Sequence, residues 1–161
     1  MTTAVARTRN RAFTLIELIA VMVVLAVLAG IAIPKYFDYA DRAKSASLQG
    51  ALGGIRTGVA NFYADSSFNG SAAYPTLSEL TTLGTVMQEA LPNNPYNGLN
   101  TVQTVSQAAA NARTTSNTTQ YGWNYYVDNT TTPPEMIFFA NSTDATRVDD
   151  GSGGYVDAND L

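Results

Sequence analysis

The sequence contains no cysteine and no histidine, and these two absences exclude several kinds of functional site. Without cysteine the chain cannot form a disulfide bond or use a thiol nucleophile. Without histidine it cannot form a His-based catalytic triad or the usual zinc site. Charged residues make up only 14% of the chain, and no paired carboxylates, nucleophile–base pair or phosphate loop occurs at a recognisable spacing. We therefore do not expect an enzyme.

The few charges are unevenly distributed along the chain. Arg7, Arg9 and Arg11 precede a long apolar run, and no acidic residue precedes it. A chain that begins at residue 13 has 6 basic and 13 acidic residues. Such an acidic surface repels nucleic acid, so nucleic-acid binding is not expected.

The apolar run extends from Phe13 to Ile33 and is interrupted only by Thr14 and Glu17. As an α-helix it would be roughly 30 Å long, at about 1.5 Å per residue, which matches the hydrocarbon core of a bilayer. The arginines before it would keep the N-terminus in the cytoplasm. The run therefore predicts a single membrane-spanning helix, with the remainder of the chain on the opposite side.

Two ordinary interpretations of this run are a cleaved signal peptide, cut near residues 30–32, and a simple signal anchor. Neither accounts for Glu17, because neither requires an acid inside its apolar region. An ionisable group in hydrocarbon costs a few kcal/mol or more, so it is by default a candidate functional residue. Glu17 is that candidate here.

The residues around Glu17 also resemble a known processing site. The stretch AFTLIELI, from Ala12 to Ile19, is similar to the cleavage and methylation site of type IV pilins and the pseudopilins of type II secretion. This resemblance implies that a prepilin peptidase cuts between Ala12 and Phe13 and methylates the new amino terminus. Glu17 matches the characteristic glutamate of the family, and Pro34 matches its proline. Ala12 departs from the glycine that the family usually has there.

The resemblance implies an α+β, pilin-like fold. A long N-terminal helix, first membrane-spanning and then amphipathic, would pack on a small antiparallel β-sheet. The expected division is a basic leader, residues 1–12, which is removed, and a transmembrane and filament-core helix, residues 13–34. An amphipathic helix of the head, residues 35–64, and the globular head itself, residues 65–161, would come next.

Glu17 is expected to set the register between subunits. In a bundle of such helices its carboxylate can pair with the Phe13 amino group of an adjacent subunit, because two opposite buried charges compensate each other. The alternative is that Glu17 lies at the lipid–water interface, favoured by the helix dipole. Gly30 and Pro34 predict a bend in the helix, since proline removes a backbone donor.

The pattern becomes one-sided after Pro34. Apolar residues recur at spacings of four and three residues, which predicts one buried helix face made of Leu48, Leu52, Ile55, Val59 and Phe62. Gly50, Gly53, Gly54 and Gly58 weaken this helix, and we expect them to allow close approach of a sheet.

The head is expected to contain a short helix from the sequence PTLSEL to about Leu83, and then a turn-rich stretch. Residues 101–120 are predicted to be a long, low-complexity connection. Two strands, Tyr121–Val127 and Glu135–Ala140, are predicted to form an antiparallel hairpin. Trp123 and Tyr125 would alternate onto the core face of that hairpin; the alternative is an aromatic platform that stacks a ligand.

The C-terminal stretch combines acids with glycines. Oxygen ligands on a flexible loop suit calcium, so the candidate ligands are Asp149, Asp150, Asp157 and Asp160. This end loosely resembles the calcium-binding loop of major pseudopilins. The alternative is a frayed acidic tail. No other cofactor is expected.

The leading hypothesis is a structural subunit of a membrane-anchored helical filament, a pseudopilin of a type II protein secretion system. One alternative is a type IV pilin for adhesion or motility, and another is a membrane-anchored binding module that does not polymerise. The expected partners are prepilin peptidase, other copies and related pilin-like subunits, and an inner-membrane assembly platform. The expected location is the bacterial inner membrane, with a cytoplasmic N-terminus and a periplasmic head, and then the filament.

Overall fold

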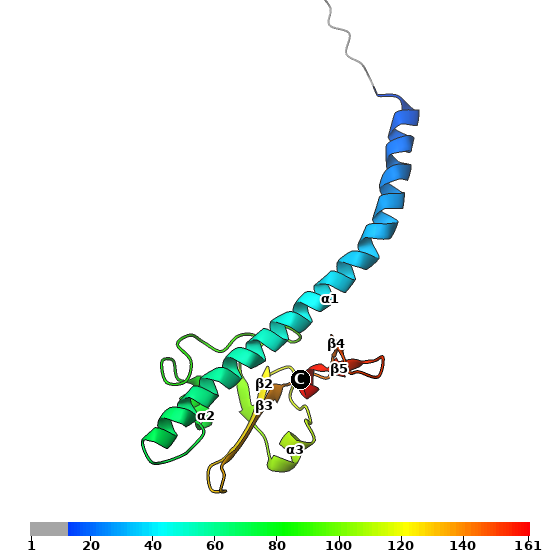
Figure 1. Cartoon of the computed structure of the whole chain (residues 1–161). Helices are drawn as coiled ribbons and strands as arrows, with labels where there is room; N and C mark the ends of the chain where they lie inside the picture. The colour runs from blue at the N-terminus through cyan, green and yellow to red at the C-terminus, as the bar shows by residue number, and fades with distance from the viewer. Residues whose placement is uncertain (1–12) are drawn as a thin grey trace, which may run out of the picture. The chain divides into compact units, whose positions relative to one another are not determined.

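The computed structural model describes residues 13–161, and the expected leader, residues 1–12, lies outside this part. The chain divides into two units, of which the first ends at Tyr39 and the second begins at Ala40. We call residues 13–39 the stem and residues 40–161 the head. Figure 1 shows their elements, and the long helix α1, Leu15–Phe68, contributes to both.

The stem consists of the first part of α1. The helix continues through Pro34 without interruption, so the prolyl residue does not end it. Within the head, α1 extends to Phe68, beyond the expected limit of residue 64. It stops where Gly70 adopts a left-handed backbone, with φ of +85°, and where Ser71 N–H donates to Ser66 O at 3.1 Å. This arrangement satisfies carbonyl groups at the helix end, and glycine is the residue that adopts it most readily.

The apolar face of α1 in the head is buried, as its spacing predicts. Leu48, Leu52, Ile55 and Val59 are each at most 2% exposed and form the hydrophobic core with the sheet. Phe62, the fifth member of the predicted face, is half-buried. The amphipathic interpretation of this segment is therefore confirmed.

The expectation that the helix glycines allow close approach of a sheet is wrong at all four positions. A Cβ atom added at Gly50, Gly53 or Gly54 would meet nothing within 4 Å, so no sheet approaches the helix there. At Gly58 a Cβ would lie 2.7 Å from Met87 Sδ and 3.2 Å from Val86 O, so the segment that comes close to the helix there is the turn containing Val86 and Met87. The first three lie on the solvent side of α1, away from the buried face.

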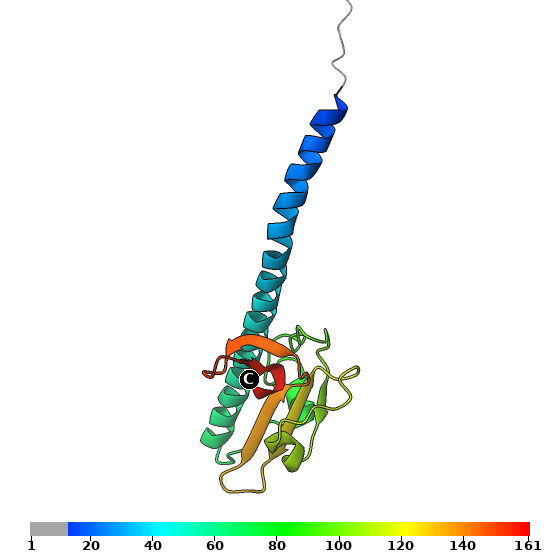
Figure 2. The same ribbon diagram turned by 90° about the vertical axis from the view of Figure 1, so that its right-hand side faces the viewer.

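The head contains a three-stranded sheet in the order β1-β2-β3. Its strands are β1, Val102–Thr104, β2, Trp123–Asp128, and β3, Glu135–Ala140. Strands β2 and β3 form the predicted antiparallel hairpin, with Trp123 opposite Ala140 and Asp128 opposite Glu135. Figure 2 shows the two strands side by side, alongside the second half of α1. The pilin-like α+β prediction is confirmed, although β1 pairs with β2 in parallel.

The segment of residues 101–120 is more ordered than expected. It contains β1 and the short helix α3, Gln107–Asn111, so its interpretation as a simple connection is wrong. The strand has three residues and the helix has five. Elements this short show no clear hydrophobic periodicity, so they are not recognised in a polar segment.

Both faces of β2 are covered. Trp123 and Tyr125 are completely buried in the core against α1, and Asn124, which points to the other face, is also completely buried. The core interpretation is confirmed, and an accessible aromatic platform is excluded. Trp123 Nε1 donates to Pro92 O at 2.9 Å, and the Tyr125 hydroxyl donates to Pro75 O at 2.5 Å. Burial raises the pKa of Tyr125 far above its usual range.

The predicted short helix is α2, Leu77–Thr81, and Thr76 caps it. The chain then runs through turns toward β1 and passes close to β2. A Cβ atom at Gly122 would lie 1.9 Å from Leu99 O, so only glycine permits this contact between the two segments.

Asparagine side chains form hydrogen bonds that hold the turns before β1 against the segment before β2. Asn97 Nδ2 donates to Tyr121 O at 3.0 Å and to Asn141 O at 3.3 Å, and Asn97 Oδ1 accepts from Leu99 N–H at 3.1 Å. Asn94, which is completely buried, donates to Gly122 O at 2.8 Å. Tyr121 O is satisfied by asparagine side chains, whereas Gly122 O also accepts from the backbone N–H of Asn141 at 3.0 Å.

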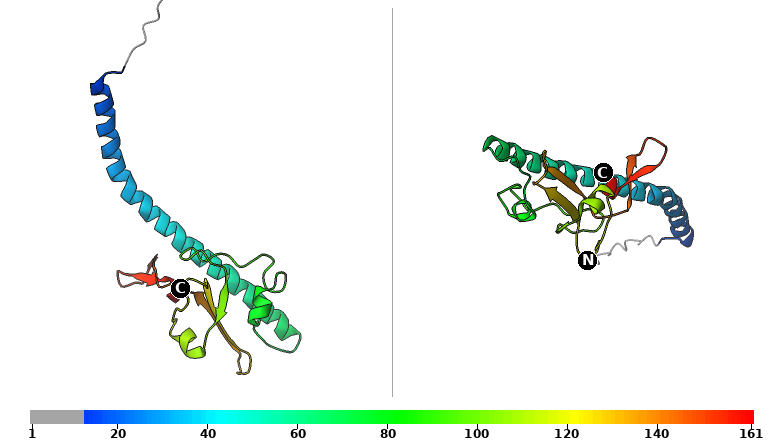
Figure 3. Two further views of the ribbon diagram at one scale, coloured as in Figure 1. Left: turned by 180° about the vertical axis from the view of Figure 1, so that it is seen from behind. Right: turned by 90° about the horizontal axis from the view of Figure 1, so that it is seen from below.

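The C-terminal stretch forms a second, two-stranded sheet of β4, Ala145–Asp149, and β5, Tyr155–Asp157, with the 3-10 helix η1, Ala158–Asp160, after it. Figure 3 shows this hairpin beside the long helix. Its contact with α1 is polar: Arg147 N–H donates to Ser45 Oγ at 2.8 Å, and the Arg147 guanidinium pairs with Asp41 at 3.1 Å. The alternative of a frayed tail is therefore wrong.

Candidate functional site

The candidate site is the N-terminal end of α1, where Phe13, Thr14 and Glu17 lie together. The Thr14 backbone N–H donates to Glu17 Oε2 at 2.9 Å, and Thr14 Oγ1 donates to the same oxygen at 2.8 Å. In return, Glu17 N–H donates to Thr14 Oγ1 at 3.3 Å. Thr14 and Glu17 thus form a capping box, which satisfies backbone donors that the first helical turn leaves without partners.

This arrangement gives the two carboxylate oxygens of Glu17 different surroundings. Oε2 accepts both bonds from Thr14, whereas Oε1 accepts none from the residues that the structure describes. Phe13, immediately before the box, is 89% exposed. An exposed carboxylate with one uncommitted oxygen can accept a further charged hydrogen bond.

Thr14 is a residue of this site that the sequence interpretation missed. In the sequence it stands out only as an interruption of the apolar run. Its spacing from Glu17, Thr-x-x-Glu, is the signature of a capping box directly before an apolar helix, and this signal was present. The same spacing occurs in the head at Thr76 and Glu79, where the structure again has a capping box.

The stem beyond the box is uncovered. Its fourteen large apolar side chains from Phe13 to Ile33 are between 45% and 89% exposed. In the described part of the chain, α1 is the one helix long and apolar enough to cross a membrane, and its most apolar stretch has no buried residue. This surface requires an apolar environment, which lipid or other apolar helices can provide.

The two residues that predict a bend in the stem lie within the helix. Gly30 and Pro34 both lie inside α1, and a Cβ atom at Gly30 would meet nothing within 4 Å. The predicted bend at these residues stays a prediction. Ala12, the residue before the expected cleavage, lies outside the described residues, so the processing site stays a prediction as well.

The candidate calcium ligands lie around the β4–β5 hairpin, where the backbone already uses some of their oxygens. Asp150 Oδ1 accepts from Ser152 N–H at 2.7 Å and from Gly154 N–H at 3.0 Å, and these bonds, with that of the Ser152 hydroxyl, hold the pKa of Asp150 below its usual value. Asp149 Oδ1 accepts from Gly151 N–H at 2.7 Å. Within residues 13–161 no three acidic side chains are grouped as a metal site.

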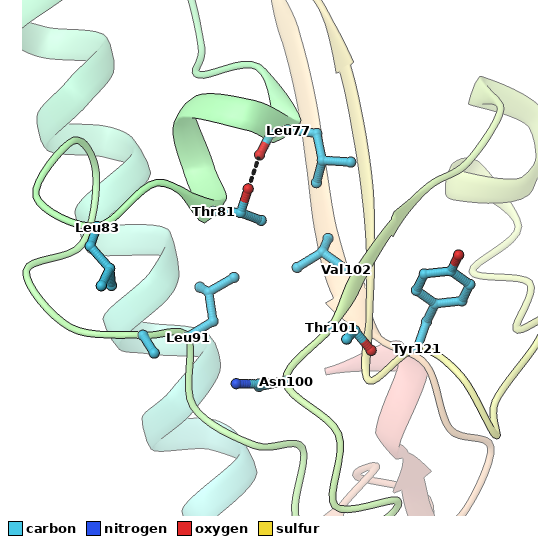
Figure 4. Close-up of a pocket in the computed structure, with 9 residues that line it drawn as sticks. Leu77, Thr81, Leu83, Leu91, Asn100, Thr101, Val102 and Tyr121 are labelled. Atoms are coloured by element: carbon cyan, nitrogen blue, oxygen red, sulfur yellow. Dashed lines mark hydrogen bonds between the residues drawn. The ribbon is translucent and has the colours of Figure 1, made fainter.

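The head has a cavity of about 480 Å³ between α2, β1 and the turns that connect them (Figure 4). Leu77 and Thr81 line it from α2, and Thr81 Oγ1 donates to Leu77 O at 2.9 Å. Of its nine lining residues, Tyr121 alone has a titratable side chain. The cavity is therefore an apolar hollow with hydroxyl and amide groups at its edge, and its lining offers no acid–base pair.

Comparisons with known proteins concern mainly the stem. Residues 7–33 match the model of the prokaryotic N-terminal methylation motif. The chain is 38% identical over 56 residues to the fimbrial protein EcpC of Eikenella corrodens, which covers 35% of this chain and 37% of that protein. It is 37% identical over 57 residues to the type IV major pilin protein PilA of Myxococcus xanthus, covering 35% and 26% of the two chains.

A third relative extends the similarity beyond α1. The type IV major fimbrial protein FimA of Dichelobacter nodosus is 30% identical over 90 residues, which is 55% of this chain and 56% of that protein. The matches thus span between about a quarter and just over half of the length of these relatives. No solved structure matches the chain.

Proposed function

We propose that this chain is a member of the type IV pilin family and a structural subunit of a helical filament that assembles from the membrane, because residues 7–33 match the N-terminal methylation motif and its relatives include type IV pilins. Members of this family are structural rather than catalytic. The relatives share only part of their length with this chain, so the function of the whole protein is our inference from the stem and the head together.

The observation that carries the proposal is the uncovered stem. Burying fourteen large apolar side chains is worth on the order of 20 kcal/mol, at about 1.5 kcal/mol or more for each. A bilayer can provide this environment while the subunit is stored, and the stems of neighbouring copies can provide it in the filament. A subunit can therefore move from one to the other without exposing its stem to water.

Glu17 determines how neighbouring stems align. Cleavage before Phe13 creates an amino group there, and methylation preserves its positive charge. Glu17 Oε1, which Thr14 leaves without a bond, can accept from the Phe13 ammonium of an adjacent copy. In the apolar core of a bundle, this carboxylate and this ammonium meet at only one axial offset between neighbouring stems. Any other alignment buries uncompensated charges. The capping box with Thr14 is the arrangement that Glu17 has in the single chain, before assembly.

The proposed partners are those that membrane storage, cleavage and filament assembly require. A prepilin peptidase would cut before Phe13 on the cytoplasmic side, and an assembly platform in the bacterial inner membrane would receive the subunit. Other copies and related pilin-like subunits would form the filament. The head would lie in the periplasm before assembly and on the filament surface afterwards.

Two kinds of filament fit this role. A type II secretion pseudopilus is our first proposal, because the cysteine-free chain lacks the C-terminal disulfide loop common in pilins. A type IV pilus for adhesion or motility is the second, and the names of the relatives favour it. Deleting the gene separates them: loss of secreted proteins supports the pseudopilus, and loss of surface pili and twitching motility supports the pilus.

The processing step has a direct test. The N-terminal mass of the membrane-extracted protein should correspond to N-methylated Phe13 as the first residue. An intact Met1 would indicate a signal anchor, and a start near Ile33 would show that the stem is removed and would overturn the proposal. Electron microscopy of sheared cells should show filaments that contain the chain, whereas a binding module that does not polymerise would give none.

A further inference from the structure

The two edges of the three-stranded sheet are protected to different degrees. Strand β3 forms one edge, and prolines at positions 133 and 134 come directly before it. Arg56 Nη2, from α1, also donates to Phe138 O of this strand at 3.4 Å. Strand β1 forms the other edge, and the stretch from Leu99 to Val105 contains no charged residue and no proline. Charges, prolines and covering groups are the usual means of keeping a further strand from an edge, and β1 has the fewest of them.

The backbone of β1 uses alternate residues to bond to β2. Thr101 O accepts from Gly122 N–H, directly before β2, at 2.9 Å, and Val105 N–H donates to a carbonyl of β2 at 3.0 Å. Since these residues face β2, the backbone groups of Val102 and Thr104 point to the opposite side, away from the sheet. Within residues 13–161, no segment outside the sheet forms a backbone hydrogen bond with Val102 or Thr104. Their outward groups can therefore bond to a further strand.

The cavity of about 480 Å³ lies beside this free edge. Leu77, Leu91 and Val102 line it, and Figure 4 shows their side chains around one space. Leu83 lines it as well and is 64% exposed, so the cavity is open to solvent on that side. None of its lining residues is Asp, Glu, Lys or Arg. An open apolar hollow of this kind suits an aliphatic side chain.

The segment that forms the cavity carries negative charge only. Residues 74–111 include eight of the nine lining residues, and they contain Glu79 and Glu89 but no Lys or Arg. Glu89 directly precedes Ala90 and Leu91, which line the cavity. Charge complementarity therefore favours an occupant that has a basic residue close to its aliphatic side chain.

We propose that β1 binds an extended, basic peptide segment of a partner protein, which adds to the sheet as a further strand. The backbone of the segment bonds to the outward groups of Val102 and Thr104, and one of its aliphatic side chains enters the cavity. Strand addition of this kind obtains affinity from backbone hydrogen bonds and specificity from a pocket beside the edge. The site lies entirely within the head, so it does not depend on the proposed filament.

The first test measures the affinity of the detergent-solubilised full chain for synthetic peptides by fluorescence anisotropy. The probe is a labelled peptide of sequence Lys-Thr-Val-Thr-Val-Lys, which alternates polar and aliphatic side chains as a strand does. One control peptide has serine in place of both valines, and the other has glutamate in place of both lysines. The probe should bind about tenfold more tightly than either control. Equal affinities for the three peptides, or no saturable binding of the probe below about 1 mM, would overturn the proposal.

The second test alters the edge and the cavity separately. Thr104→Pro removes the N–H that points away from β2 and keeps the bonds between the strands, so it should weaken binding of the probe about tenfold. Thr104→Ala, the matched control, keeps this N–H and should bind the probe as wild type does. Ala90→Phe places a ring at the cavity and should make the valine and serine peptides bind equally. If Thr104→Pro and Thr104→Ala bind the probe equally, the peptide does not lie on this edge and the proposal fails.

Amide hydrogen exchange of the wild-type chain tests the site without a substitution. Saturation with the probe should slow exchange at Val102 and Thr104 about tenfold, because both amides become bonded, and should leave Gln103, which already faces β2, unchanged. Unchanged exchange at Val102 and Thr104 would overturn the proposal even if Thr104→Pro proved unstable. Protection of these two amides that rises with protein concentration in the absence of peptide would show that a second copy occupies the edge, and would also overturn it. Absence of filaments would contradict only the proposed function.

Discussion

The two parts of α1 differ in what covers their apolar side chains, although a single helix contains both. Leu52, in the head, is 2% exposed, whereas Leu25, in the stem, is 58% exposed. The chain itself covers the first of these residues and leaves the second uncovered. The contrast teaches that the helix serves two cores, one within the chain and one that other molecules must complete.

The two capping boxes provide a second comparison. The bonds between Thr14 and Glu17 measure 2.9, 2.8 and 3.3 Å, and the corresponding bonds between Thr76 and Glu79 measure 2.8, 2.8 and 3.4 Å. Their local geometry is therefore the same. The difference lies in the helix that each box begins, which is an uncovered apolar stem in one case and a short helix of the head in the other.

Replacing these two glutamates should have the largest effect of the substitutions considered, and it should show that the two capping boxes differ in function. Glu17→Ala should reduce filament yield by about a hundredfold or more, because the ammonium of the adjacent copy would be buried without a partner. Glu79→Ala, the matched control, should assemble normally and lose less than about 1 kcal/mol of stability. The measurement is the amount of filament in the sheared fraction. Equal yields from the two variants would show that Glu17 is only a cap.

Leucine truncation should sharpen the contrast between the two cores. Leu52→Ala should lower the free energy of unfolding of the head by about 2–5 kcal/mol, because it leaves a cavity in a packed core. Leu25→Ala should change that free energy by less than about 0.5 kcal/mol, yet should make filaments dissociate at lower denaturant concentration. Denaturant titrations of the detergent-solubilised chain and of the filament measure the two effects. A large loss of head stability in Leu25→Ala would contradict the division.

Glycine substitutions on α1 should give a smaller effect, with opposite signs at two nearby positions. Gly54→Ala should raise the free energy of unfolding by up to about 1 kcal/mol, since alanine favours helix and the added methyl group meets nothing within 4 Å. Gly58→Ala should lower it, because the methyl group would lie 2.7 Å from Met87 Sδ and 3.2 Å from Val86 O. Thermal unfolding of both variants is the measurement. If both substitutions stabilise the head, the Met87 side chain moves away from a methyl group at position 58 without cost.

The smallest expected effect is a pH dependence from the head capping box. Hydrogen bonds from Thr76 lower the pKa of Glu79 from its usual value of 4.5. A carboxyl group whose pKa is lowered by folding stabilises the protein above its unfolded pKa, and this stabilisation is lost as the pH falls through the lower, folded value. Wild type should therefore lose more stability than Glu79→Gln when the pH falls from above 4.5 to below the folded pKa. Identical pH profiles would show that the bonds do not favour the charged form.

Much of the architecture could be predicted from the sequence, because its strongest signals are long. The apolar run and the stripe from Leu48 to Val59 extend over several helical turns, and the hairpin of β2 and β3 has two aromatic-rich strands around a turn. Each of these elements is specified locally. The structure agrees with all three.

The errors concern features that depend on tertiary contacts. Nothing in the sequence distinguishes Gly54, which faces open space, from Gly58, which contacts Met87. Strand β1 and helix α3 are too short to give a periodic pattern, and their partner β2 is distant in sequence. Of the candidate site, Glu17 is evident from its charge and Thr14 from its Thr-x-x-Glu spacing, so both can be recognised locally in the sequence.

The asparagine contacts of the head have a consequence for chemical ageing. Asn-Gly sequences deamidate when the next backbone nitrogen attacks the side-chain amide, and asparagine is correspondingly thermolabile. At Asn97 this nitrogen, that of Gly98, donates to Asn94 O at 2.7 Å, and the amide itself is held on both sides. At Asn69 the nitrogen of Gly70 also donates, to Ser67 O at 3.1 Å, but the side-chain amide is exposed and, among the residues that the structure describes, it bonds only to Asp65. For the proposed filament subunit, peptide mapping of aged protein should therefore find deamidation at Asn69 well before Asn97.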